Sequence, residues 1–333
     1  MSTVTAEELR EIVVSVLAEL STASAPTGSA PAPPSPAPRA APATTTPPAA
    51  SASTSPGRSS TSDGDPRADA GVAIEVADPT VPAARHEIGV ENPVNAPGLA
   101  NLAASTGARL AVGRAGPRPR TSTALLFAAD HAVTQDAIFG DVPDALLEQF
   151  GLFTVQTQVS SQDEYLLRPD LGRLLDDEAK RVVAERCVAH PQVQVVVGDG
   201  LSAAAVTNNL PQIYPVIEQG LKAAGITTGT PFFVRYCRVG VMNDINDIVQ
   251  ADVVLLLIGE RPGLGVADAL SVYSGWRPTA GKTDAHRDVI CMITANGGTN
   301  PLEAGAFVVE HVKTVLQHQV SGVELRLTQS GSR

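Results

Sequence analysis

A carboxylate and a guanidinium, Glu260 and Arg261, stand side by side in a glycine-rich segment that follows an apolar run. The segment, residues 259–265, reads GERPGLG. Glycines let a backbone approach a ligand closely, and a carboxylate there can accept charge-assisted hydrogen bonds. The segment lacks the full G-x-G-x-x-G fingerprint and a phosphate-loop lysine. It indicates either a ligand-binding edge or a loop without a ligand, in which Glu260 pairs with Arg261 or the segment begins a helix.

Three more polar or glycine-rich segments follow apolar runs. They read GDGLS at residues 198–202, RYCRVG at 235–240 and NGGTNP at 296–301. Ser202 has the residue type of a helix N-cap, which is a structural role. If the four segments share one edge of a sheet they form a cleft, although they do not by themselves name its ligand.

Conventional catalytic sets find little support. Asp130 and His131 are adjacent, but a histidine on a helix beside a carboxylate is more often a structural group. The other histidines show no metal-ligand spacing, and no G-x-S-x-G elbow is present. We therefore expect no catalytic residue and no metal site here, so that a cofactor or another subunit carries any reaction.

The elements that must position these loops alternate along the second half of the chain. The sequence predicts strands at residues 193–197, 232–237, 253–258 and 289–293, and helices at 202–224 (interrupted at Pro211 and Pro215), 244–250, 267–273 and 302–319. Continuous β-branched and leucine runs that alternate with helices are typical of a parallel sheet covered on both faces. The predicted fold is α/β: a doubly wound, mostly parallel, Rossmann-like sheet over residues 191–328, with ligands at the carboxyl ends of its strands.

The first half of the chain divides into three parts. Residues 1–20 contain an amphipathic helix at 5–20, with an apolar stripe opposite several glutamates. Residues 21–70 begin with a long run of Ala, Ser, Thr, Pro and Gly, which predicts a disordered linker. Residues 71–190 form a smaller, mainly helical region, with helices at 98–105 and 121–134 and a short strand at 109–112.

Composition limits the partners. The formal net charge is -11 and the pI is near 5.0, so nucleic acid and anionic membranes are disfavoured by long-range repulsion. No apolar run reaches the length of a membrane span, and three widely spaced cysteines suggest neither a disulfide framework nor a zinc site. These features favour a cytoplasmic protein.

Several long stretches of the chain, taken together, resemble the small (light) chain of ethanolamine ammonia-lyase. The similarity extends over about residues 88–327 and is strongest at 113–121 (GRAGPRPRT), 129–131 (ADH), 168–173 (RPDLGR), 200–202 (GLS), 231–236 (PFFVRY) and 259–265. The resemblance implies a Rossmann-like domain that contacts adenosylcobalamin at the interface with a large TIM-barrel subunit. It also implies conversion of ethanolamine to acetaldehyde and ammonia by a radical route, as a carbon–nitrogen lyase.

Carried over residue by residue, the family's cobalamin contacts fall on Val239, Glu260 and a position that aligns with Val289. Residues 290–299 read ICMITANGGT where the family usually has I-S-N-I-H before Gly-Gly-Thr, so one residue is inserted and Cys291 is the alternative to Val289. The family's usual glycine before Arg238 is Cys237 here. Residues 284–286 begin like D-x-H-x-x-G, but Val289 replaces the glycine, so we expect His286 to be a loop residue and the cofactor to keep its own benzimidazole on cobalt.

Two other functions remain open, a stand-alone nucleotide-binding α/β enzyme and a non-catalytic microcompartment scaffold. The first should carry a phosphate fingerprint after its first strand, and GDGLS is too short for one. Residues 5–20 also look like the peptides that direct cargo into bacterial microcompartments. A shell protein is therefore a second expected partner, and a microcompartment is the alternative location.

Overall fold

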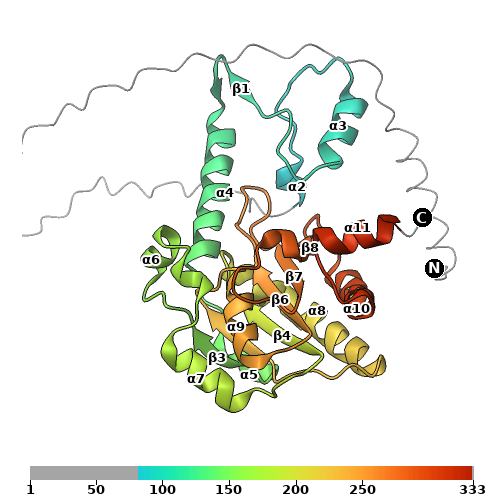
Figure 1. The fold of residues 1–333 in the computed structure, drawn as a ribbon. Coiled ribbons are helices and arrows are strands. Elements are labelled where there is room, and N and C mark those ends of the chain that lie inside the picture. Colours follow the sequence, from blue (N-terminus) through green and yellow to red (C-terminus); the bar gives the residue numbers. More distant parts are fainter. Residues whose placement is uncertain (1–81, 332–333) are drawn as a thin grey trace, which may run out of the picture. The chain divides into compact units, whose positions relative to one another are not determined.

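The computed structural model describes residues 82–331. The predicted helix at 5–20 and the linker at 21–70 lie outside these residues. The described residues belong to one compact unit, and Figure 1 shows its helices gathered around a sheet. This mixed α/β architecture confirms the predicted fold class.

The sheet has six strands, of which four neighbours pair in parallel. Its order is β3-β5-β4-β6-β7-β8, in which β7 runs antiparallel to both neighbours and β8 therefore runs in the direction of β6. The strands are β3 (Phe153–Gln156), β4 (Val193–Gly198), β5 (Phe232–Arg235), β6 (Val253–Gly259), β7 (Leu270–Trp276) and β8 (Arg287–Ile293). Strand β3 comes from the region predicted as mainly helical.

Helices cover both faces of the sheet and create two apolar cores. Along β4, Val195 and Val197 join the core beneath α8 (Ala203–Ala223) and α10 (Pro301–His318). Val196 joins the core beneath α7 (Asp177–Arg186) and α9 (Val241–Val249). Because successive side chains of a strand point to opposite faces, a continuous apolar run supplies both cores. This confirms the doubly wound arrangement.

Three local predictions were wrong. Residues 267–273 were predicted as a helix, but Leu270–Trp276 is strand β7, since pairing with β6 and β8 outweighs local helical spacing. Residues 109–112 form no strand. Helix α8 continues without a break through Pro211 and Pro215, because its buried face packs along the core.

The remaining elements surround the sheet. They are α2 (Pro82–Arg85), α3 (Ala96–Ala104), the hairpin of β1 (Arg114–Ala115) and β2 (Arg118–Pro119), α4 (Thr121–Phe139), α5 (Asp144–Gln149), α6 (Gln162–Leu167), η1 (Leu171–Arg173), η2 (Asp284–His286) and α11 (Val323–Gly331). Helices α3 and α4 match the predicted helices, and α4 is longer than predicted. None of the described helices combines the length and hydropathy needed to cross a membrane.

Candidate functional site

The four polar segments do meet at one edge of the sheet. Gly198 at the end of β4 pairs with Val234 of β5 and Ile258 of β6. Gly259 pairs with Leu270, which in turn pairs with Ile293 at the end of β8. We call the loops after β4, β5, β6 and β8 the rim. The predicted shared edge is therefore confirmed.

Glu260 is partly buried and held by its neighbours on the rim. Its Oε1 accepts hydrogen bonds from the Ser271 hydroxyl (2.7 Å) and from the Met292 backbone N–H (2.6 Å). Within residues 82–331, no ion pair joins Glu260 to Arg261, and Oε2 accepts no hydrogen bond. The alternative in which Glu260 pairs with Arg261 was wrong. The carboxylate is oriented and keeps one oxygen available to a ligand.

The Met292 contact comes from a β-bulge in β8. The register between β7 and β8 shifts between Leu270 and Val272, and Met292 has a φ of 56°. A bulge accommodates one extra residue in a strand and redirects it. The bulge turns the Met292 N–H toward Glu260.

The two alternatives for the β8 contact lie at different distances from Glu260. Val289 pairs with Tyr273. It lies two residues before Cys291, which is roughly 7 Å away along an extended strand. The peptide that joins Cys291 to Met292 supplies the N–H bound by Glu260. The structure brings Glu260 together with this peptide and does not place Val289 beside it.

Val239 lies in the loop between β5 and α9, and a separate segment supports this loop. The Arg238 N–H donates to the Gly172 carbonyl (2.8 Å), and the Arg238 guanidinium stacks on the Tyr165 ring. The Tyr165 hydroxyl donates to the Cys237 carbonyl (2.6 Å), and burial raises the pKa of Tyr165. The RPDLGR segment, which contains Gly172, therefore helps to fix the position of Val239.

Asp199 ties the ends of β4 and β5 together, a role that the sequence did not reveal. Its carboxylate accepts hydrogen bonds from the backbone N–H groups of Tyr236 (2.6 Å), Cys237 (2.8 Å) and Gly200 (2.8 Å). Burial raises the pKa of Asp199 to about 6, although the three backbone donors oppose the change. The only signal in the sequence was a carboxylate between two glycines.

Glycines allow the turns at the centre of the rim to pack closely against each other. A Cβ on Gly200 would lie 2.1 Å from the Gly259 carbonyl oxygen, and one on Gly198 would lie 2.5 Å from the Cys237 Sγ. The turns after β4 and β6 thus pack backbone against backbone. In the strand order β5-β4-β6 these turns lie between Val239 and Glu260, and we call them the floor of the rim.

The N-terminus of α8 is capped by the side chain of Ser202. The Ser202 hydroxyl accepts from the Ala205 N–H (3.1 Å) and donates to the Ala267 carbonyl (2.7 Å), which confirms its role as an N-cap. A phosphate would have to displace this cap and would lie near the Asp199 carboxylate. This arrangement disfavours the nucleotide-binding alternative.

A comparison with family models gives one match that bears on these features. The model for the ethanolamine ammonia-lyase light chain (EutC) matches residues 96–326, which is most of the chain. The chain belongs to this family. A light chain implies a larger partner subunit, and the matched region includes the whole rim together with α3, the hairpin and α4.

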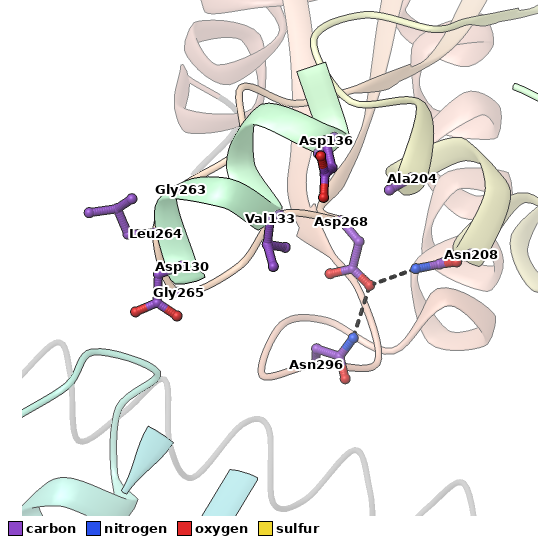
Figure 2. Close-up of a pocket in the computed structure, with 12 residues that line it drawn as sticks. Asp130, Val133, Asp136, Ala204, Asn208, Gly263, Leu264, Gly265, Asp268 and Asn296 are labelled. Atoms are coloured by element: carbon purple, nitrogen blue, oxygen red, sulfur yellow. Dashed lines mark hydrogen bonds between the residues drawn. The ribbon is translucent and has the colours of Figure 1, made fainter. Parts of the chain in front are cut away.

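A cavity of about 320 Å³ opens beside the rim of this light chain. Figure 2 shows Asp268 between the amides of Asn208 and Asn296, which donate to its Oδ2 at 3.1 and 2.9 Å. The Thr294 hydroxyl donates to its Oδ1 (3.1 Å). Asp268 is thus fully engaged in joining the loop after β8 to α8, and we assign it a structural role.

Two residues considered for chemistry have structural roles in this light chain. Asp130 is buried and forms an ion pair with Arg109 (2.7 Å), so it is no acid–base partner of His131. His286 caps η2, where its Nδ1 accepts from the Thr283 N–H (3.1 Å). It precedes β8 and lies at the edge of the sheet opposite the rim, as expected of a loop residue.

Proposed function

We propose that this light chain binds adenosylcobalamin on its rim, and that the large subunit closes the other side of the cofactor. The assembled enzyme then converts ethanolamine to acetaldehyde and ammonia by a radical route. The observation that carries the proposal is Glu260, an oriented carboxylate with one oxygen available beside the closely packed glycines of the floor.

The residues of the rim fit a corrinoid. A corrin carries amide side chains around an apolar ring, and a carboxylate is a strong acceptor for amide N–H groups. Oε2 of Glu260 is available for such a bond. Val239 offers apolar packing on the other side of the floor, and Val289 or Cys291 offers a third contact from β8. The geometry around Met292 favours Cys291 of these two.

The rim residues bind and orient; they do not react. When bound, adenosylcobalamin supplies the radical through cleavage of its cobalt–carbon bond. Glu260 fixes the orientation of the ring by accepting an amide hydrogen bond, and the floor allows close packing that excludes water. His286, the histidine that resembles a cobalt-ligand motif, lies at the opposite edge of the sheet, so it would not replace the benzimidazole of a bound cofactor.

Reconstitution tests this proposal. The light chain, the large subunit and adenosylcobalamin are purified separately and combined with ethanolamine, and released ammonia is measured. We expect ammonia only when both chains and the cofactor are present. Full activity of the large subunit without the light chain would contradict the proposal.

Residues 5–20 carry a second part of the proposal. Their apolar stripe opposite Glu7, Glu8, Glu11 and Glu19 is typical of a docking helix, and we propose that it binds a microcompartment shell protein. In cells that build the shell, a fluorescent protein fused to residues 1–62 should concentrate in the shell. If the fusion stays diffuse, the light chain is dispersed in the cytoplasm instead.

A further inference from the structure

Helix α4 carries an apolar stripe that nothing in the described chain covers. Its buried residues are Thr123, Asp130, Thr134 and Ala137, which occupy one sector of the helix. Leu125, Ala128, Ala132 and Phe139 lie on the opposite side at helical spacing, and all four are exposed. Leu125 and Phe139 are 46% and 51% exposed. We call these four residues the outer stripe. The exposed side of α4 is therefore more apolar than its buried side, which is the reverse of a helix that faces solvent and typical of one that binds a partner.

A basic hairpin leads directly into this helix. Arg114 of β1 and Arg118 of β2 are exposed, and Arg120 is the N-cap of α4. Within residues 82–331, neither Arg114 nor Arg118 forms an ion pair. Two uncompensated guanidinium groups in a chain of formal net charge -11 call for an acidic partner surface.

The same helix is continuous with the rim. Its Asp130, Val133, Asp136 and Ala137 line the cavity beside Gly263 and Gly265 of the loop after β6, and the Thr134 hydroxyl contacts the Gly263 carbonyl (3.4 Å). In Figure 1 the other end of α4 lies by β1. A partner that covers the rim therefore meets α4 as well, and can follow it to the hairpin.

We propose that the outer stripe and the hairpin are the surface on which the large subunit docks. The large subunit offers an apolar groove to the stripe and carboxylates to Arg114 and Arg118. This inference rests on the proposed function, because it takes the large subunit as the partner that closes the rim. A second copy of the chain is a poorer match, since its own hairpin carries the same arginines.

Point variants of exposed residues test the surface. Ala132→Glu places a charge in the outer stripe, and Arg118→Glu reverses a charge on the hairpin. Val188→Glu is the control, because Val188 is 57% exposed and precedes β4 at the opposite edge of the sheet. Circular dichroism checks folding, and the Kd between full-length light chain and large subunit is measured by biolayer interferometry. We expect at least tenfold weaker binding for the first two variants and no change for the control. The loss for Arg118→Glu should shrink at high salt.

The experiments also distinguish the large subunit from other partners that could cover the outer stripe. If Ala132→Glu and Arg118→Glu bind the large subunit as tightly as the wild type, the inference is overturned. A light-chain dimer in sedimentation velocity that Ala132→Glu dissociates, with unchanged large-subunit affinity, assigns the stripe to a second copy. If deletion of residues 1–62 instead increases dye binding to the stripe and that affinity is again unchanged, the chain's own N-terminal segment is the occupant. Failure of the wild type to bind the large subunit would instead refute the proposed function itself.

Discussion

Replacing Asp199 by asparagine separates the charge of this partly buried group from its shape. Asp199 accepts backbone hydrogen bonds from Tyr236 and Cys237, on the loop that leads to Val239. Asparagine keeps one acceptor oxygen and sets an amide N–H against the other donor. One buried N–H then loses its acceptor, which costs about 1–3 kcal/mol at every pH.

The pH dependence follows from the pKa of Asp199, which burial raises from 3.8 to about 6. Because the folded-state pKa lies above the unfolded value, the group contributes stability that is fully present below the unfolded pKa. That stability is lost as the pH rises through about 6. With one pKa unit equal to about 1.4 kcal/mol, wild-type Asp199 contributes about 1.4 kcal/mol more at pH 5 than at pH 8. Asparagine contributes no such change.

Urea unfolding of the light chain at several pH values between 5 and 8 measures this difference. The free energy of unfolding of the wild type minus that of Asp199→Asn should fall by about 1.4 kcal/mol from pH 5 to pH 8. Asp247→Asn is the control, because Asp247 is exposed on α9 and should give a flat difference. A flat difference for Asp199→Asn as well would refute the argument that burial governs this carboxyl.

Three further predictions concern other parts of the chain. Glu260→Ala should raise the Kd of the assembled complex for adenosylcobalamin about tenfold to a hundredfold, since a hydrogen bond to a charged group contributes about 1.5–3 kcal/mol; unchanged affinity in equilibrium dialysis would remove Glu260 from the site. Gly198→Ala should destabilise the chain by about 1–3 kcal/mol, because its Cβ would overlap Cys237, and adding Cys237→Gly should recover part of the loss in urea unfolding; no recovery would show that the overlap is not the cause. Arg109→Ala should lower the free energy of unfolding by about 3–5 kcal/mol, because it leaves Asp130 buried without its ion-pair partner; a loss below 1 kcal/mol would show that the pair is not effectively buried.

The strands were predictable where both of their faces are buried, because such strands carry apolar side chains at successive positions. Residues 253–258 are a continuous apolar run because each residue faces one of two cores, and residues 193–197 are apolar for the same reason except at Gln194. Strand β7 was not predictable in the same way. Leu270–Trp276 mixes serine and glycine with apolar residues, and its identity as a strand depends on pairing with β6 and β8.

The location of the site followed from topology, but its contacts did not. Parallel strands place their ends at one edge, so the segments around Glu260 and Val239 could be assigned to a shared rim. The partners of Glu260 are Ser271 and Met292, and Met292 is reached only through a bulge. The partners of Asp199 come from a loop on a neighbouring strand. Contacts between segments distant in sequence leave no local pattern from which they could be predicted.

The most direct test is a cryo-electron microscopy structure of the light chain with the large subunit and a bound cobalamin. We expect a corrin amide nitrogen within hydrogen-bonding distance of the Glu260 carboxylate, with residues of both subunits in contact with the ring. A corrin enclosed by the large subunit alone, with the rim of the light chain facing solvent, would contradict the account.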